Sequence, residues 1–470
     1  HRVLLLERER FPRHQIGESL LPATVHGICT LLGVKGQLER AKFVRKNGGT
    51  FLWGLNQKPW SFGFSISPVL GDSAGFAYQV ERAKFDQILL ENARLKGVTI
   101  QEEAAVKRVI SENGRVSGVE YTDDRGRKCT ARARFVADAS GNQSVIARNV
   151  GDRVFSKFFQ NVALYCYFEN GKRLPPPNHG NILCATFNQG WFWYIPLSDK
   201  LTSVGAVIGH EHAHQLKGGY EQAMRAFIDS CPIINEYLAG ATRVTDGIYG
   251  AFRVRKDYSY SSTRFWRPGM VLVGDAACFV DPVFSSGVHL ATYAGLLAAR
   301  SINTVLNGAI DEARCFQEFE SRYRREFSNF YQFLIAFYDI NQDEESYFWH
   351  ARKVLNTSEK ANEAFVRLVA GVSEPDLALN GAAGYFEARK DIGRVFDSAG
   401  NTYVDALDAD PAASDFNSQT LINDLLSEAA ELQALGRRGS VRKTEKPAMP
   451  GGLIASPDGF RWREVPASEV

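Results

Sequence analysis

The segment "GMVLVGDAACFVDPVFSSGVHLATYAGLLAARSINTVL" spans residues 269–306 and determines our fold prediction. It begins with a short, continuously apolar run, which is typical of a strand buried on both faces. Gly274 and Asp275 end that strand, and a long apolar helix follows from about Ser286. This strand–turn–helix order predicts an α/β protein in which the strand end carries polar groups for a ligand.

The first residues of the chain form a second strand of this kind. Residues 2–7, "RVLLLE", are apolar and end at Glu7, a carboxylate suited to holding an adenosine ribose. In dinucleotide-binding folds a Gly-rich turn lies about 20 residues before such an acid. That turn would precede His1, so we expect the chain to lack the start of the full protein and to bind its cofactor poorly. A strand that merely ends in glutamate is the alternative.

A third segment, "VADASG" at 136–141, suits the same site. It ends a strand at Asp138, and Gly141 has no side chain to obstruct a close approach to the adenine half of a cofactor. Asp275 can take ribityl or ribose hydroxyls, and Pro282 belongs to the "DP" pair that completes the ordered set. The set predicts FAD. Because no second Gly-rich turn follows, we expect the reducing equivalents to arrive from elsewhere.

The remaining chain predicts a mixed α/β (α+β) protein built around this core. A helical pattern covers 18–33, and residues 78–97 indicate a strand end followed by an amphipathic helix that stops at Gly97. A β-meander with an Asn113-Gly114 turn follows. We expect a first FAD-binding part, an inserted β-sheet domain for substrate, a second FAD-binding part, a helical region, and a polar, partly disordered tail: 1–156, 157–265, 266–310, 311–395 and 396–470.

Composition excludes several classes of protein. Net charge is +2 over 470 residues, so nothing indicates nucleic-acid binding. No apolar run is long enough to span a membrane, and no signal peptide is visible. The seven cysteines are scattered without C-x-x-C spacing, which favours free thiols and a cytoplasmic location.

Two rigid indoles stand in the segment "GWFWYIP", residues 190–196. Trp191 and Trp193 are two apart, so a strand would place both on one face, and Pro196 would fix the backbone after them. Core packing is the ordinary explanation for such a pair.

The start of the long helix is a candidate anion site. Ser286 and Gly287 would offer free backbone N–H groups and a partial positive charge to a halide or to the flavin. A plain N-cap formed by Ser285 or Ser286 is the alternative.

The segments "WFWYIP", "GDAACFVDPVFSSGVHLA", "FPRHQIGESLLP" and "YQVERAKFDQILL" resemble the flavin-dependent halogenases, in particular the branch of the chondrochloren and chloramphenicol halogenases. The resemblance covers roughly residues 1–375 and implies an FAD-binding Rossmann-like fold of the flavin monooxygenase type. It also implies that reduced FAD, O2 and chloride or bromide generate hypohalous acid. The flavin segments are shared with aromatic hydroxylases, whereas W-x-W-x-I-P is more specific to halogenases.

The resemblance assigns roles to individual side chains. Lys46, in "RKNGGTFLWG", would orient hypohalous acid or form a chloramine with it, although Lys42 and Arg45 leave its register open. Trp191 and Trp193 would keep the organic substrate away from the flavin. Arg82 would contact the flavin phosphates or ribityl chain, with a solvated helix residue as the alternative.

Phe284 stands where tryptophan halogenases carry a glutamate, which favours an activated, phenol-like substrate in secondary-metabolite or antibiotic biosynthesis. Relatives in this branch often act on substrates tethered to a carrier protein, and the aromatic-rich segment 330–355 is a candidate surface for that partner, with helix packing as the alternative. A separate flavin reductase would supply reduced FAD. An aromatic hydroxylase and an inactive flavoprotein fragment are the rival hypotheses.

Several polar residues have two interpretations. Glu18, in "IGES", is either a residue beside the flavin or an acidic helix start. His210, His212 and His214 alternate, but they have few partner ligands, so we expect no metal site. His289 is expected to be a packed core histidine.

Overall fold

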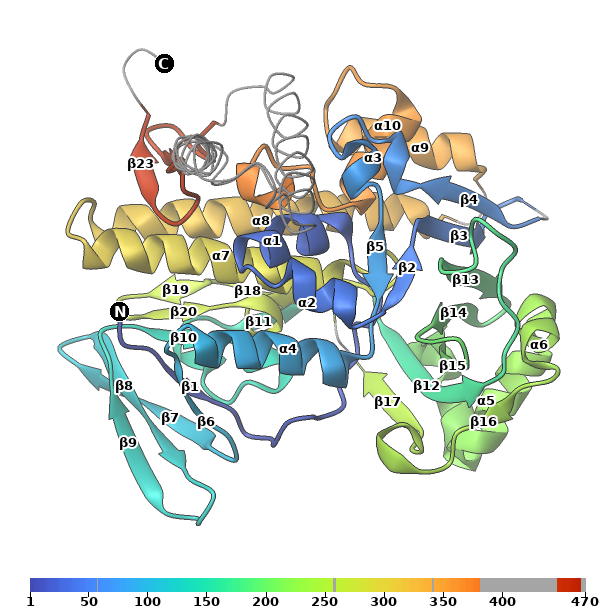
Figure 1. Cartoon of the computed structure of the whole chain (residues 1–470), viewed down its shortest axis with the longest axis horizontal. Helices are drawn as coiled ribbons and strands as arrows, with labels where there is room; N and C mark the ends of the chain where they lie inside the picture. Colours follow the sequence, from blue (N-terminus) through green and yellow to red (C-terminus); the bar gives the residue numbers. More distant parts are fainter. Residues whose placement is uncertain (57, 257–258, 340–341, 381–445, 466–470) are drawn as a thin grey trace, which may run out of the picture.

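The computed structural model describes residues 1–56, 58–256, 259–339, 342–380 and 446–465. Two long helices, α7 (Ser286–Leu306) and α8 (Glu312–Phe337), run side by side along the molecule (Figure 1). The large, mostly antiparallel sheet, in which β13 and β3 pair in parallel, lies toward one end of them, and the three-stranded meander lies toward the other (Figure 1).

Short parallel strand pairs form the predicted α/β core. Strand β1 (Leu4–Leu6) pairs with β6 (Thr99–Gln101), and β10 (Val136–Asp138) pairs with β20 (Met270–Leu272). The second pairing continues past the strand ends, because Val273 N–H donates to the Asp138 carbonyl at 2.9 Å. The "VADASG" and "VLVGDAA" segments therefore end side by side, as parallel strands of one nucleotide site require.

The large sheet contains eight strands and is not confined to 157–265. It also includes β3 and β4, from residues that we assigned to the first FAD-binding part. A Cβ atom on Gly48 would lie 1.7 Å from the Phe62 carbonyl oxygen, so glycine at this position lets the backbones of β3 and β4 pair closely. The strands of this large sheet are β3 (Gly48–Leu52), β4 (Trp60–Gly63), β12 (Asn161–Glu169), β13 (Ile182–Phe187), β14 (Gly190–Pro196), β15 (Leu201–Gly209), β16 (Thr242–Arg243) and β17 (Arg253–Lys256).

The remaining strands form smaller sheets that include the predicted meander. These strands are β2 (Val44–Lys46), β5 (Ala77–Gln79), β7 (Ala105–Glu112), β8 (Arg115–Thr122), β9 (Lys128–Arg132), β11 (Arg153–Phe155), β18 (Tyr260–Ser262), β19 (Trp266–Arg267) and β21 (Cys278–Phe279). The shorter helices are α1 (Cys29–Leu31), α2 (Lys35–Arg40), α3 (Gly71–Ala74), α4 (Arg82–Leu95), α5 (Tyr220–Asp229), α6 (Pro232–Leu238), α9 (Glu344–Val354) and α10 (Ala361–Val369).

The helix predicted over 18–33 begins later than expected. Its first element is a π-helix, η1 (Ala23–Ile28), preceded by Pro22. Glu18 and Leu20 are instead extended against β5, since Val80 N–H donates to the Glu18 carbonyl at 2.7 Å and Leu20 N–H donates to the Tyr78 carbonyl at 2.9 Å. The apolar spacing of this segment fits a buried extended chain as well as a helix.

Part of the predicted polar tail is folded. Strands β22 (Leu453–Ala455) and β23 (Trp462–Glu464) form a hairpin, and the Trp462 indole N–H donates to Ser301 Oγ on α7 at 2.9 Å. The same ring lies 5.4 Å from the Arg300 guanidinium and 5.1 Å from that of Arg322. A buried tryptophan at the end of a polar stretch is the signal that we missed. The rest of the tail lies outside the described residues.

Candidate active site

The two predicted nucleotide-binding turns pack against each other. Gly141 starts η3 (Gly141–Gln143) with φ +75°, and Gly274 starts η7 (Gly274–Ala276) with φ +60°; η3 contacts η7. A Cβ atom on Gly274 would lie 3.0 Å from that of Ala291, so glycine allows the turn to approach α7. This close backbone packing is what a dinucleotide cradle needs.

Asp275 presents an uncommitted carboxylate at this cradle. Its side chain is partly exposed and accepts no hydrogen bond within the described part of the chain. Burial raises the pKa of Asp275 to about 6, against the opposing charges of Arg82, Arg255 and Arg153. A free carboxylate for hydroxyl groups, three nearby guanidiniums for phosphates and a glycine turn that is open at Gly141 fit FAD.

Glu7, Asp138 and Arg82 are already engaged in local contacts. Glu7 accepts from its neighbour Glu9 N–H at 2.9 Å, and Asp138 accepts from Ser144 Oγ at 2.5 Å. The Arg82 guanidinium donates to Asp86 at 2.7 Å and is 14% exposed. These bonds hold the turns in shape, and direct roles for these three side chains in FAD binding remain predictions.

Lys46 is a buried amine at the end of β2. Its ammonium donates to the Leu20 carbonyl at 3.0 Å and lies 5.4 Å from the Phe64 ring centroid. Among the described residues no carboxylate pairs with it. Burial, which disfavours the charged form, lowers the pKa of Lys46 to about 7. At neutral pH the Lys46 side chain is therefore a neutral, nucleophilic amine in a large fraction of the molecules.

A cavity joins Lys46 to the start of α7. Its volume is about 10 Å³, enough for roughly one water molecule. Apart from Lys46 and Ser285, its lining is apolar: Leu21, Gly49, Phe51, Phe62, Phe64, Ile182, Val283, Phe284 and Val369.

The start of α7 lacks the side-chain cap that we considered as the alternative. Ser285 has φ +60° and makes no capping hydrogen bond, and the buried Ser286 Oγ has no partner among the described residues. Pro282 fixes the turn by accepting from Ser285 N–H at 2.9 Å. A Cβ atom on Gly287 would lie 2.8 Å from the Phe279 ring, so glycine is needed there. The helix start thus keeps unsatisfied N–H donors beside the Lys46 cavity.

The two tryptophans point to one face of β14, as predicted, and both are buried. Their ring centroids are 6.2 Å apart. They belong to the main core, whereas Phe192 and Tyr194, between and after them, pack in a second core on the other face. Each indole N–H is held: Trp191 donates to Tyr338 at 2.8 Å, and Trp193 donates to Ser203 at 3.2 Å.

Tyr338 connects Trp191 to the segment before α7. Its hydroxyl donates to Asp281 Oδ2 at 2.8 Å while it accepts from the indole. We did not identify either residue from sequence. Asp281 directly precedes Pro282 in the quoted motif, and that position could have identified it. Tyr338 had no such motif, because the aromatic residues around it are those of an ordinary packed helix.

We expect Tyr338→Phe to destabilise the protein by about 1–3 kcal/mol, because it leaves the Trp191 N–H unpaired and removes a donor from buried Asp281. Urea unfolding monitored by tryptophan fluorescence measures this change. Tyr331→Phe, on α8 just before Tyr338, is the control, since its hydroxyl bonds only to part-buried Ser156 among the described residues. Equal stability of Tyr338→Phe and wild type would show that the link is not formed.

Glu18 is a buried carboxyl close to the tryptophan pair. It accepts from Tyr167 at 2.8 Å, and Ser203, the acceptor of Trp193, lies beside it. Burial raises the pKa of Glu18 to about 7, although hydrogen bonding and Arg82 oppose the shift. The acidic-helix-start interpretation is wrong, because Glu18 precedes the helix and is extended.

The Glu18 pKa has a consequence for stability. Because the pKa of Glu18 is higher in the folded state than in the unfolded state, protonated Glu18 contributes fully to stability below the unfolded-state pKa. This contribution is lost as the pH rises through the folded-state pKa. Between pH 4.5 and 7, wild type should therefore lose about 3 kcal/mol relative to Glu18→Gln, which does not titrate. Chemical denaturation of both proteins across this range tests it, and parallel curves would contradict the shift.

The other polar candidates have ordinary surroundings. His289 is buried and hydrogen-bonded to Glu326 at 2.8 Å, as a packed histidine. His210, His212 and His214 lie in a 3-10 helix, η5 (His210–Gly218), rather than on a strand, and no metal-ligand cluster occurs within the described ranges.

Rings in the 330–355 segment face mainly inward, although Trp349 is 49% exposed. No described helix is long and apolar enough to cross a bilayer.

Comparison with known proteins identifies the class. The tryptophan halogenase family model matches residues 1–71 and 67–397. The chain belongs to this family and is a flavin-dependent halogenase, so the predicted FAD-binding Rossmann-like fold and enzyme class are confirmed.

Individual relatives agree with this assignment. The myxobacterial chondrochloren halogenase CndH has a solved structure that is 55% identical, covering 98% of this chain and 94% of that chain at a TM-score of 0.74. The halogenase CmlS is 28% identical, covering 99% and 80% at 0.70. A protein named tryptophan 2-halogenase from Chondromyces crocatus is 33% identical over 79% of this chain and 71% of its own length.

Proposed function

We propose that the protein chlorinates a neutral, electron-rich aromatic ring, and that Lys46 receives the halogen and presents it to the substrate. The observation that supports this most is the buried Lys46 amine, without an acid partner, on a cavity that reaches the uncapped start of α7. Bound reduced FAD, supplied by a separate flavin reductase, would provide the electrons that let O2 oxidise the halide to hypohalous acid.

Three groups of residues would have separate roles in this reaction. The N–H groups of Ser286 and Gly287 would hold chloride or bromide, because a helix start favours an anion. Trp191 and Trp193 would exclude the organic substrate from the flavin side. Lys46 would then hydrogen-bond the small oxidant or take up its halogen, because a neutral amine is a nucleophile while an ammonium is not.

The lining of the Lys46 cavity supports the substrate class. Phenylalanine rings dominate it, and Lys46 is its one charged side chain among the described residues. An ammonium or carboxylate of a free amino acid brought against this apolar lining would have no partner, which is costly. At about 10 Å³ the cavity can admit a small oxidant but not an aromatic ring, so the ring would meet the oxidant at the cavity wall, where a neutral phenol buries no charge. An electron-rich ring also needs less acid–base help, in accordance with Phe284 at the cavity wall.

A carrier-tethered substrate is the finer form of this proposal. A relative from Pseudomonas fluorescens, 27% identical over 72% of this chain, is named as a chlorinase of 1H-pyrrole-2-carbonyl on a peptidyl-carrier protein. Exposed Trp349 is the described part of the 330–355 segment that such a partner could contact.

The test supplies reduced FAD, O2 and chloride together with 4-methylphenol, free tyrosine, or a tyrosyl thioester on a carrier domain. We expect a product with the chlorine isotope pair from the phenol or the thioester and little from free tyrosine. A product heavier by one oxygen atom would instead support a hydroxylase. Equal rates for tyrosine and its thioester would remove the carrier partner.

A further inference from the structure

A continuous hydrogen-bonded chain links Glu18 to the protein surface. His14 Nε2 lies 2.8 Å from the Tyr167 hydroxyl, and that hydroxyl lies 2.8 Å from Glu18 Oε1. Glu18 and Tyr167 are buried, whereas the His14 ring is partly exposed. Each member can accept a proton on one side and release one on the other, so the geometry is that of a proton relay.

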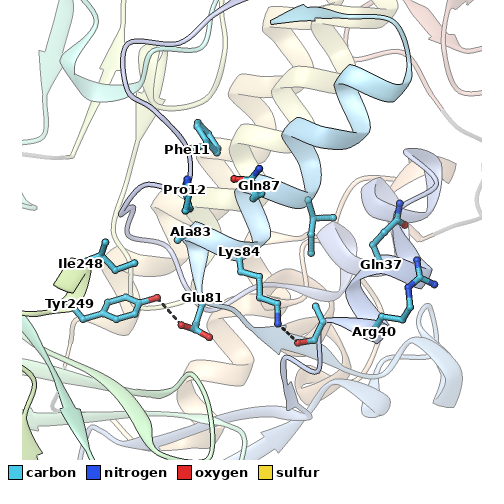
Figure 2. A pocket seen from close by; sticks show the side chains of 12 residues that line it. Phe11, Pro12, Gln37, Arg40, Glu81, Ala83, Lys84, Gln87, Ile248 and Tyr249 are labelled. Atoms are coloured by element: carbon cyan, nitrogen blue, oxygen red, sulfur yellow. Dashed lines mark hydrogen bonds between the residues drawn. The ribbon is translucent and has the colours of Figure 1, made fainter. Parts of the chain in front are cut away.

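The outer end of this chain lies beside an open groove of about 750 Å³. Tyr249 lines the groove, and Figure 2 shows its hydroxyl directed at Glu81, to which it donates at 3.0 Å. The Tyr249 ring packs against both His14 and Tyr167, with centroid distances of 6.5 and 4.6 Å. His14 itself is partly exposed, so the outer end of the chain is open to solvent next to this groove.

The inner end lies among the residues proposed for catalysis. Glu18 Oε2 is buried and has no hydrogen-bond partner within the described residues; Ser203, although adjacent, does not meet hydrogen-bond geometry with it. Ser203 itself accepts from Trp193, and Leu20, two residues after Glu18, accepts from Lys46. The Glu18 carboxyl therefore lies between Tyr167 on one side and the Trp193–Ser203 and Lys46–Leu20 contacts on the other.

The proposed reaction needs such a group because it consumes a proton. Reduced FAD, O2, chloride and one proton give oxidised FAD, hypochlorous acid and one water. O2 takes up four electrons, two from the reduced flavin and two from chloride, and one of its oxygen atoms leaves as that water. A chamber closed by buried indoles has no bulk water to supply the proton.

We propose that Glu18 donates the proton consumed in halide oxidation and that Tyr167 and His14 return a proton to it from solvent. This inference rests on the proposed function and assigns Glu18 a different role from that of a fixed flavin ligand.

The charges around the relay suit this exchange. The Glu18 pKa of about 7 leaves both of its protonation states populated at neutral pH, with Tyr167, Ser203, Arg82 and Glu81 as its surrounding polar groups. Tyr165 and Tyr249 also lie near it. Burial, then the charges of Arg253, Arg255, Arg82 and Arg13, lower the pKa of His14 to about 4. His14 is therefore neutral at pH 7, with one N–H and one lone pair.

The first experiment is an infrared pH titration of the full chain without FAD. We expect the protonated-carboxyl absorption of wild type to contain a component that titrates near pH 7, above that of Asp275, and this component should be absent in Glu18→Gln and titrate at least one pH unit higher in Tyr167→Phe. Tyr165→Phe is the matched control, because it removes from the same strand a hydroxyl that, within the described residues, is hydrogen-bonded to neither Glu18 nor His14, and it keeps the ring that stacks on His14 at 6.2 Å. A band unchanged in Glu18→Gln would overturn the assignment.

The second experiment measures chlorinated 4-methylphenol per reduced FAD oxidised. We expect His14→Ala to lose about tenfold at pH 8, with recovery on adding imidazole, which can carry protons in its place. Tyr165→Phe should retain the wild-type yield. A Glu18→Gln variant with weaker FAD binding but an unchanged yield and pH profile would contradict the relay. If wild type chlorinates no probe, the proposed function fails, while the infrared titration still decides whether Glu18 exchanges protons through Tyr167.

Discussion

Replacement of Lys46 by methionine should reduce halogenated product by at least about 100-fold, the scale of a lost catalytic group, while reduced FAD is still oxidised. The amine is the cavity's one described nucleophilic nitrogen, and methionine fills similar space without it. The same change should stabilise the apoprotein at pH 7 by up to about 4 kcal/mol, because it removes an amine whose pKa falls from 10.5 to about 7 on burial. A variant that loses activity and gains stability is typical of a catalytic group whose burial lowers the stability of the folded protein.

Lys42→Met is the control for this experiment. Lys42 is exposed, stands four residues earlier, and was the alternative register for the active lysine. Product analysis and chemical denaturation of both variants separate the two sites. Chlorination that survives in Lys46→Met, or is lost instead in Lys42→Met, would show that the lysine is misassigned.

Gly205→Val should displace the Trp193 ring and uncouple flavin oxidation from halogenation. Gly205 lies opposite Trp193 in the β14–β15 pair, and a Cβ atom there would lie 2.2 Å from the nearest indole carbon. Since two other ring atoms would lie at 2.5 Å, the indole has to move. Such overpacking costs roughly 1–3 kcal/mol. We expect product per FAD oxidised to fall severalfold, with a matching loss in the free energy of unfolding.

Two further variants make this result specific. Gly240→Val places the same side chain where no atom lies within 4 Å of the added Cβ, so stability and yield should hold. Combining Gly205→Val with Trp193→Phe removes the ring atoms in the clash and should recover part of the stability, as a positive coupling in a double-mutant cycle. Equal yields for Gly205→Val and wild type would mean that the position of Trp193 does not matter.

Local sequence patterns predicted the parts of the site that short segments build alone. The alternation of "WFWY" placed Trp191 and Trp193 on one face because strand geometry has a period of two. The glycines of "ADASG" and "VGDAA" marked turns that pack together because parallel strand ends meet at one edge. These inferences needed no knowledge of distant contacts.

Features that depend on distant contacts were not predictable in this way. Tyr338 and Asp281 meet across 57 residues, and the Glu18–Tyr167 bond spans 149. The helix predicted over 18–33 was begun too early, at Glu18, because Leu20 and Leu21 fit a helix or a buried strand equally well. Tertiary pairing with β5 decides between them, and that pairing has no local signature.

A sequential-mixing experiment tests the central claim, that the aromatic substrate never needs to contact the flavin. Reduced FAD-loaded enzyme is mixed with O2 and chloride, 4-methylphenol is added after a variable delay, and chlorinated product is measured against flavin absorbance. If Lys46 holds the halogen behind the Trp191–Trp193 face, the yield stays high after the flavin is fully oxidised. A yield that falls in step with flavin reoxidation would contradict the account.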